Sequence, residues 1–271
     1  MRRFTKLVVA AALAVVAFTS MTACARTTTK NSWPRIQQTK KVVIGLDDSF
    51  VPMGFRAKSG KIVGYDIDLA KAVFKQYGIK CSFQTIDWSM KETELRNQTI
   101  DLIWNGYSVT PDREKVVKFS QPYLKNHQVL VTKAKDNINS FADMKGKTVG
   151  AQTGSSGAAD IDAQPKLLKN LVKDKEPVLY DTFNDAFIDL NADRIQGIVI
   201  DEVYARYYVA HQKNPSDYTI TDGSFPAESF AIGMRKTDDV LADKINAALD
   251  KLEANGQLAK IQKKWFGTTT E

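Results

Sequence analysis

Cysteine and histidine are scarce in this chain of 271 residues, which contains two of each. Metal sites and disulfide scaffolds need several such residues at characteristic spacings. His127 and His211 lie at ligand spacing neither from each other nor from Cys81. We therefore expect no metal and no cofactor. If Cys24 is modified, as argued below, Cys81 has no intrachain disulfide partner, and we interpret it as a small buried residue.

A membrane-spanning run and a strong excess of one charge are also missing. The apolar run at residues 7–18 would measure roughly 18 Å as a helix, short of the ~30 Å hydrocarbon core of a bilayer. The formal net charge is +7, and residues 1–23 carry three basic and no acidic residues, so the remainder has a net charge of +4. Such a mild excess predicts no nucleic-acid partner. With 43% hydrophobic and 25% charged residues, the composition is that of a soluble globular protein.

The N-terminus has the pattern of an export signal. Three basic residues precede the short apolar run, and the signal ends at Met21-Thr22-Ala23-Cys24. This ending resembles the bacterial lipobox, in which a cysteine follows small residues, with Met21 in place of the usual leucine. We predict a signal peptide over residues 1–23 and lipidation of Cys24. The alternative is a non-lipidated signal cleaved nearby, with Cys24 incidental.

The segment that follows is polar and lacks periodicity from Ala25 to Lys40. It predicts an unstructured tether, which we place at residues 24–34, because Trp33 and Pro34 mark where order begins.

Short strand-like runs then alternate with amphipathic helical segments. Asp66 is the expected N-cap of its helix, Thr237 caps a helix that ends at Gly256, and the alternation predicts an α/β fold with largely parallel sheets. The expected strands are 41–46, 81–86, 101–105, 129–132, 148–151, 178–180 and 197–200, and the expected helices are 65–78, 91–97, 181–192, 202–212, 237–256 and 256–266.

Two turns could receive an anion. The glycine-rich segment at residues 150–157 follows a strand and opens a helix, so its amides and hydroxyls could bind one; Gln152, Ser155 and Ser156 are the candidates here. A flexible turn with no ligand is equally compatible with that pattern. In the second turn, Arg113 lies five residues beyond Ser108 and could offer a bidentate fork to a carboxylate. The alternative is a surface arginine that pairs with a neighbouring acid.

Carboxylates follow two of the predicted strands. Asp201 and Glu202 come directly after the strand at 197–200, where the carboxyl ends of parallel strands form ligand sites in open α/β sheets. Asp201 could equally be a helix N-cap, and both roles can hold together. Asp47 and Asp48 end the first strand and are followed by the aromatic Phe50.

From Lys41 to Phe266 the chain resembles the polar amino-acid solute-binding proteins of ABC importers, the family of the bacterial histidine-, glutamine- and arginine-binding proteins. The order and spacing of several short motifs over this length carry the resemblance. They are Gly45-Leu46-Asp47-Asp48-Ser49-Phe50-Val51-Pro52, Gly64-Tyr65-Asp66-Ile67-Asp68-Leu69-Ala70, Ser108-Val109-Thr110-Pro111-Asp112-Arg113, Phe119-Ser120-Gln121-Pro122-Tyr123, Gly154-Ser155-Ser156 and Lys264-Trp265-Phe266.

The resemblance implies a two-lobe periplasmic-binding-protein fold of class II, with a ligand cleft between hinge-linked lobes. We predict a first lobe of residues 35–126 and 223–271 and a second lobe of residues 127–222, with crossings near Asn126–Gln128 and Asp222–Ser224.

The resemblance also implies roles for the candidate residues. Gly106 and Arg113, helped by the hydroxyls of Ser108 and Ser155, stand where relatives bind the ligand α-carboxylate. Asp201 stands where they bind the α-ammonium. Asp47, Phe50 and Trp88 match positions that line the ligand side chain. Asn105 departs from the family pattern, which commonly has a small residue there, and the pair Trp88 and Trp104 is a second departure.

We therefore expect a lipid-anchored, monomeric binding protein, not an enzyme, on the outer side of the cytoplasmic membrane. It would deliver an L-amino acid to an ABC permease and its ATPase subunits. The alternatives are a dehydratase-like cleft enzyme, for which Glu202 or Asp48 would be the general acid, and an amino-acid sensor. Asp47 could accept hydrogen bonds from an amide or pair with a cation, and Phe50, Trp88 and Trp104 could pack on the ligand side chain. We expect a polar uncharged or cationic ligand, with a glutamine-like one slightly favoured.

Overall fold

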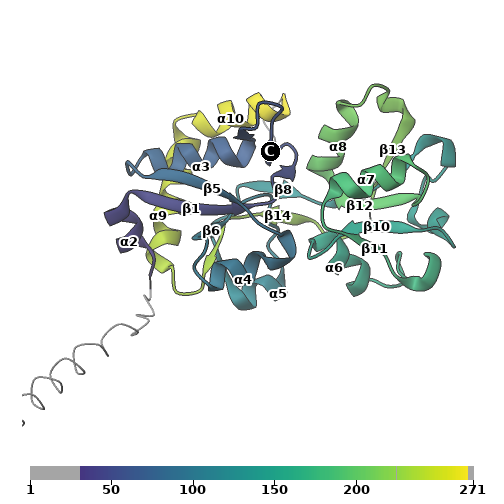
Figure 1. Cartoon of the computed structure of the whole chain (residues 1–271), viewed down its shortest axis with the longest axis horizontal. Helices are drawn as coiled ribbons and strands as arrows, with labels where there is room; N and C mark the ends of the chain where they lie inside the picture. Colours follow the sequence, from purple (N-terminus) through teal and green to yellow (C-terminus); the bar gives the residue numbers. More distant parts are fainter. Residues whose placement is uncertain (1–30, 224, 268–271) are drawn as a thin grey trace, which may run out of the picture. The chain divides into compact units, whose positions relative to one another are not determined.

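The computed structural model describes residues 31–223 and 225–267 (Figure 1). The predicted signal peptide and Cys24 lie outside the described residues. Within the described ranges, no helix has both the length and the apolar character needed to cross a bilayer.

The first sheet has five strands in the order β5-β1-β6-β15-β7. The sheet contains both parallel and antiparallel strand pairs. Strand β1 is parallel to β5 and β6, whereas β15 is antiparallel to β6 and β7. Val42, Ile44 and Leu46 are fully buried in β1, as expected for a β-branched strand covered by helices on both faces. The strands are β1 (Lys41–Leu46), β5 (Lys80–Thr85), β6 (Leu102–Ile103), β7 (Val117–Phe119) and β15 (Gly233–Arg235).

The second sheet also has five strands, in the order β11-β10-β12-β9-β13. Here β10 is parallel to β11 and β12, and β9 is antiparallel to β12 and β13. The expectation of largely parallel sheets is therefore wrong, because half of the strand pairs in each sheet are antiparallel. The strands are β9 (Gln128–Lys133), β10 (Val149–Gln152), β11 (Val178–Tyr180), β12 (Gly197–Asp201) and β13 (Tyr218–Asp222).

Two stretches of chain connect the sheets and run side by side (Figure 1). One leads from β8 (Leu124–Asn126) through His127 into β9, and the other from β13 to β14 (Glu228–Phe230). The strands pair with each other, with Glu228 opposite Asn126 and Asp222 opposite Val129. The connection is thus a two-stranded ribbon. A small separate sheet contains β2 (Ser49–Phe50), β3 (Gly54–Arg56) and β4 (Ile62–Val63).

Helices cover both sheets. Beside the first sheet, α3 packs on α9 and α10, and α9 buries one face that includes Leu241, Ile245 and Leu249. The helices of this part are α2 (Trp33–Thr39), α3 (Tyr65–Lys75), α4 (Lys91–Arg96), α5 (Pro111–Val116), α9 (Asp239–Ala254) and α10 (Gln257–Phe266). Beside the second sheet lie α6 (Ser156–Ala163), α7 (Phe183–Asn191) and α8 (Glu202–Ala210).

Five short 3-10 helices complete the described elements. They are η1 (Trp88–Met90), η2 (Ala134–Asp136), η3 (Phe141–Met144), η4 (Lys173–Lys175) and η5 (Pro215–Asp217).

The predicted tether, placed at residues 24–34, ends two residues too late, because helix α2 begins at Trp33. Trp33 and Ile36 of helix α2 are buried, and the Trp33 ring packs edge-on against Tyr77 at 5.1 Å. Pro34 suits the first turn of a helix, where its missing N–H costs no hydrogen bond. Two apolar residues one turn apart are enough to dock a short helix, but too few to show a period in the sequence.

Two expected helix caps are also wrong. Gly64 is the N-cap of α3, and the Asp66 carboxylate points elsewhere, accepting from Gly106 N and Tyr123 Oη. Asp238, not Thr237, occupies the N-cap position of α9. For α3, tertiary hydrogen bonds of Asp66 replace the expected cap, and for α9 the cap position is shifted by one residue. Cys81 is only partly buried.

Candidate functional site

A small cavity, with about 10 Å³ of room for the centre of a water-sized sphere, lies where strand ends of both sheets meet. Its walls include the residues that follow β1 and β6 of the first sheet and the last residues of β10 and β12 of the second. The carboxyl ends of parallel strands are the usual ligand position in open α/β sheets. Ten of the eleven candidate residues line this cavity: Asp47, Phe50, Trp88, Asn105, Gly106, Arg113, Gln152, Ser155, Ser156 and Asp201.

The single arginine of the cavity wall is fixed by carbonyl groups and an aromatic ring. The Arg113 guanidinium donates to Ser108 O at 2.8 Å and to Gly154 O at 3.0 Å, and lies 4.5 Å from the centroid of the Tyr107 ring. These contacts replace the surface pairing with Asp112, which instead bonds Lys115. A guanidinium has five N–H groups, so donors remain for a carboxylate in the cavity.

Beside Arg113, the glycine-rich turn ends in the N-terminus of helix α6. Ser155 is the N-cap, and its Oγ accepts from Ala158 N at 3.0 Å. The first amides of a helix point outward from its N-terminus and attract anions. Arg113 and this helix end together form the positive side of the cavity.

Asp201 is a buried carboxylate of the cavity wall and lies at the junction of β12 and α8. It occupies the N-cap position, but its carboxylate makes no capping bond and accepts from Asn126 Nδ2 at 2.6 Å and Gln128 Nε2 at 2.9 Å. Burial, followed by the nearby Glu228 carboxylate, raises the pKa of Asp201 to about 7.

Asp47 supplies a second, separate carboxylate. It accepts from Ser49 N, Ser49 Oγ and, from the second sheet, Gln152 Nε2 at 2.7 Å. Burial raises its pKa above the ordinary value. Asp48 instead bonds Arg56 and Thr85, outside the cavity wall.

Aromatic rings form the apolar walls. Phe50 packs on Tyr204 and Phe183 of the second sheet's helices, with centroid distances of 5.3 and 6.0 Å. Trp88 packs edge-on against Tyr107 at 5.8 Å. Trp104 has no exposed surface and lies in the core beside Tyr123, so the suggestion that it packs on a ligand is wrong.

Gly106 occupies a position that only glycine suits. Its φ is +60°, and a Cβ there would lie 2.7 Å from Phe50 Cε1. Its N–H donates to the buried Asp66 at 2.8 Å. The amide is therefore engaged away from the cavity, and Gly106 contributes its lack of a side chain. Asn105 is buried and accepts from Asp47 N at 3.1 Å.

Ser108, the eleventh candidate, does not line the cavity but bonds to a residue that sequence reasoning missed. Its hydroxyl donates to Glu228 at 2.7 Å. Asn126 and Gln128, which hold Asp201, were missed as well. Their only signal in the sequence is a pair of amide side chains two residues apart at the predicted crossing, which places both on one face of an extended strand.

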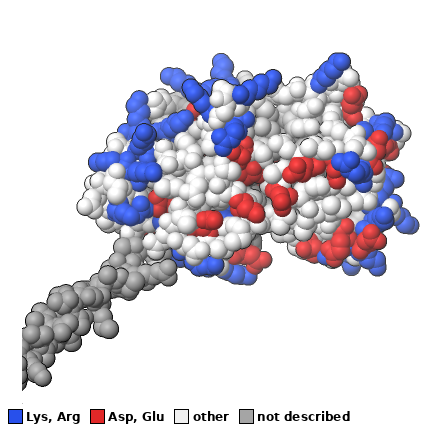
Figure 2. All heavy atoms as spheres, in the orientation of Figure 1, with Lys and Arg blue, Asp and Glu red and all other residues white. Residues whose placement is uncertain are grey.

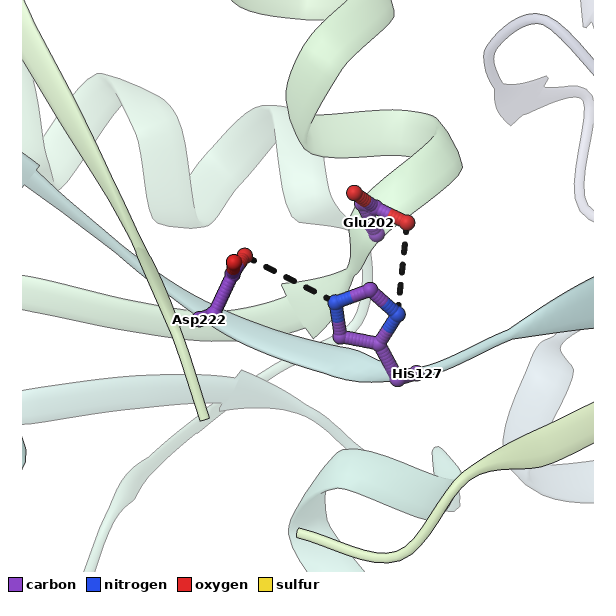
Figure 3. Close-up of side chains that lie close together, drawn as sticks. All are labelled: His127, Glu202 and Asp222. Atoms are coloured by element: carbon purple, nitrogen blue, oxygen red, sulfur yellow. Dashed lines mark ion pairs between the residues drawn. The ribbon is translucent and has the colours of Figure 1, made fainter. Parts of the chain in front are cut away.

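His127 lies between Asn126 and Gln128 in the chain and faces the opposite side of the ribbon, toward Glu202 and Asp222 (Figure 3). Its Nδ1 lies 3.2 Å from Glu202 and its Nε2 lies 3.7 Å from Asp222. One ion could not bind both ring nitrogens in this orientation, and Arg206 already pairs with both carboxylates. We interpret the cluster as an ion-pair network.

Comparison with known proteins identifies the family. Residues 42–268 match the bacterial extracellular solute-binding proteins, family 3. The chain belongs to this family. The resemblance to polar amino-acid solute-binding proteins is thereby confirmed, together with the two-lobed fold in which each sheet forms the centre of one lobe.

Individual proteins are similar to this chain over most of its length. The arginine-binding extracellular protein ArtP of Bacillus subtilis is 32% identical over 227 residues, which cover 84% of this chain and 86% of that protein. A crystal structure of an ABC uptake transporter substrate-binding protein from Streptococcus pneumoniae with bound histidine has 50% identity and a TM-score of 0.88, covering 90% of this chain and 99% of that one. An ancestral arginine-binding protein bound to glutamine has 35% identity and a TM-score of 0.75, covering 84% and 98%.

Proposed function

We propose that this family 3 protein captures a polar uncharged or cationic L-amino acid in its cleft and delivers it to an ABC permease and its ATPase subunits. The observation that carries the proposal is the charge arrangement of the cavity. One cation, Arg113, lines the same cavity as the α6 N-terminal residues Ser155 and Ser156 and two carboxylates, Asp201 and Asp47. A zwitterion removed from water needs each of its charges met individually, because an unpaired buried charge is very costly.

Ligand capture would occur by lobe closure about the two-stranded ribbon. We propose the predicted lobes of residues 35–126 and 223–271 and of residues 127–222, with the first lobe extended to include all of helix α2 from Trp33. Bonds across the cleft support a closed state: Gly154 O accepts from Lys91 and Arg113, and Gln152 donates to Asp47. Each joins an element of one sheet to the other, so ligand contacts on both sides would favour closure.

The ligand side chain would lie between Asp47, Phe50 and Trp88. Asp47 suits an amide or a cation and disfavours a second carboxylate. Relatives described with bound histidine and bound glutamine, and others named for arginine, fall within the proposed class. An acidic amino acid does not.

A binding role is favoured over an enzymatic one. The two residues considered as general acids, Asp48 and Glu202, do not belong to the cavity wall, and they pair with Arg56 and Arg206 respectively. We propose that the protein is a monomer that releases its ligand unchanged.

Isothermal titration calorimetry of the protein lacking residues 1–23 tests the ligand class. The ligands are histidine, glutamine, asparagine, arginine, lysine, cystine, glutamate and aspartate, each as the L-isomer. The D-isomer of any binder is the control for the separate binding of the α-ammonium and the α-carboxylate. We expect at least one polar uncharged or cationic L-amino acid to bind. Tight binding of glutamate or aspartate alone would refute the ligand class.

We further propose that Cys24 is lipidated and holds the protein on the outer side of the cytoplasmic membrane. Cys24→Ala should move the protein from the membrane fraction to the medium or the periplasm, whereas Cys81→Ala should leave it in place. Equal membrane retention of Cys24→Ala and the parent would contradict the anchor.

A further inference from the structure

The strongest unexplained feature is Glu228, which lies between the cleft and the ribbon. Its Oε2 accepts from Ser108 Oγ at 2.7 Å and Ser156 Oγ at 3.2 Å, and also from Asn126 Nδ2 at 3.1 Å and Gln128 Nε2 at 3.2 Å. These donors come from both lobes and from the ribbon. All four are neutral, so they orient the carboxylate without cancelling its charge.

Glu228 shares two of these donors with Asp201. Asn126 Nδ2 and Gln128 Nε2 each bond one oxygen of both carboxylates. Two carboxylates therefore converge on the same pair of amides. Among the residues that the structure describes, neither one forms an ion pair with a lysine or arginine, because the Arg113 guanidinium is directed to carbonyl groups.

The same place has more hydrogen-bond acceptors than donors. Asn126 Oδ1 and Gln128 Oε1 are buried and have no partner among the described residues. An ammonium group has three N–H donors, a positive charge and no acceptor. An ammonium would therefore supply a positive charge for the two carboxylates and N–H donors for the unpartnered amide oxygens.

We propose that Glu228 is the second carboxylate of an ammonium-binding pole, and that ligand capture expels a proton from the Asp201–Glu228 pair. This inference rests on the proposed function and deepens it. In the empty site Asp201 keeps a proton, because it is buried beside the Glu228 carboxylate and like charges so placed do not both ionise easily. When the ligand ammonium enters, both become ionised and the proton leaves to solvent.

The hydroxyl of Ser108 takes a definite role in this arrangement. It has one proton, which it donates to Glu228, so toward a ligand it offers lone pairs only. Its oxygen also accepts from Ser156 Oγ at 3.2 Å, so Ser108 orients Glu228 and links it to the second lobe.

The other charged groups near the pair also affect the pH dependence. Asp160 of α6 faces Glu228 and Arg113, and burial raises the pKa of Asp160 to about 6. Arg113 acts in the opposite direction on both Asp160 and Asp201. On the far face of the ribbon, His127 contacts Glu202 and Asp222. A variant that removes Glu228 alone is therefore needed to assign a proton to the pair.

The first measurement uses the parent protein and whichever L-amino acid of the panel binds. Titration at pH 6 in phosphate and in a buffer of high ionisation enthalpy gives the number of protons released. We expect up to about one proton at pH 6, almost none at pH 8, and an affinity that falls as pH drops below about 7. A buffer-independent enthalpy at pH 6 would overturn the proposal.

The second measurement compares the bound amino acid with its des-amino analogue, such as imidazolepropionate for histidine or 5-guanidinopentanoate for arginine. We expect Glu228→Gln to bind the amino acid at least about tenfold more weakly, to narrow the preference over the analogue and to release less proton at pH 6. Glu228→Asp should restore part of each effect. The exposed Glu253→Gln on α9 is the matched control.

The outcomes separate the two proposals. If the parent binds none of the amino acids, the proposed function fails. If the parent binds but Glu228→Gln, folded by circular dichroism, keeps the same preference and proton count, only the role of Glu228 fails. A loss of affinity equal for ligand and analogue would also overturn it, because that is the pattern of a purely structural residue.

Discussion

Gln152 Nε2 lies 2.7 Å from Asp47 Oδ2, so the last residue of β10 in one sheet donates to the carboxylate that follows β1 in the other. The same amide also donates to Asp181 O at 2.8 Å. Both hydrogens of the Gln152 amide are thereby used, and its position relative to Asp47 is well defined. Asp47 therefore has a contact to the opposite lobe in addition to its position in the proposed side-chain pocket.

The charge of Asp47 should decide between cationic and uncharged ligands. Asp47→Asn keeps the shape and an acceptor oxygen but removes the charge, so we expect a loss of roughly 2–5 kcal/mol in binding of a cationic ligand. A glutamine-like ligand should lose less than about 1.5 kcal/mol, since only a neutral hydrogen bond changes. Calorimetry measures both.

The neighbouring Asp48→Asn is the control, because Asp48 pairs with Arg56 outside the cavity. It should leave affinity unchanged. Equal losses for both ligand classes in Asp47→Asn would show that Asp47 acts on closure alone.

Arg113 should depend on its planar shape. Arg113→Lys keeps the charge but loses the fork and the stacking on Tyr107, so we expect ligand affinity to fall by roughly 2–5 kcal/mol. Lys115→Arg, on the same helix and paired with Asp112, should have no effect. Unchanged affinity of Arg113→Lys would mean that the carboxylate is bound by α6 without this side chain.

Gly106 should be sensitive to a single methyl group. Ala at φ +60° costs about 1–2 kcal/mol of stability, and its Cβ would also displace Phe50 from the cavity wall. Gly106→Ala should therefore lower both the melting temperature and the affinity. Gly60→Ala is a matched control, since its φ is +78° and a Cβ there meets nothing within 4 Å; it should lower stability alone. If Gly106→Ala and Gly60→Ala changed ligand affinity equally, the close contact between position 106 and Phe50 would be contradicted.

Asp66 should make the protein less stable as pH rises. Burial raises its pKa from the ordinary 3.8 to about 7. The folded state thus holds this proton more tightly than the unfolded chain, so its contribution is full below about pH 4 and is lost as pH rises through about 7. Asp66→Asn removes this term, and we expect a gain of about 1–4 kcal/mol in unfolding free energy at pH 8 that vanishes near pH 4.

Urea denaturation at pH 4, 6 and 8 tests this sign. The exposed Asp243→Asn on α9 should give a difference that does not vary with pH. If Asp66→Asn is less stable than the parent at pH 8, the carboxylate is ionised and well solvated by its hydrogen bonds, and the prediction is wrong.

The fold could be predicted from local pattern wherever a segment has a clear period. The strands near residues 41–46 and 197–200 and the helix near 91–97 are found close to the expected bounds. Strand direction could not be predicted, because β9 and β15 reverse direction through long-range pairing that leaves no local trace. Helix α2 has too few apolar residues to reveal itself, although Trp33 and Pro34 lie at its start.

The candidate site depended on motifs more than on period. Residues in recognisable turns, such as Arg113 and Ser155, could be named from the sequence, and the structure brings them to one cavity. Glu228 could not, because it belongs to no motif and becomes relevant only through its pairing opposite Asn126. Trp104 shows the reverse error, since an aromatic residue after a strand is as easily core as cavity wall.

The alternation of side chains along residues 126–128 has a consequence for observing the protein at work. Asn126 and Gln128 hold the Asp201 carboxylate, while His127 between them is held by Glu202 and Asp222 on the opposite face. Any twist of this three-residue stretch as the lobes move must turn both faces together. We therefore expect the NMR signals of the His127 imidazole to shift when a ligand enters the cleft, and His211, the C-cap of α8, would supply the internal reference.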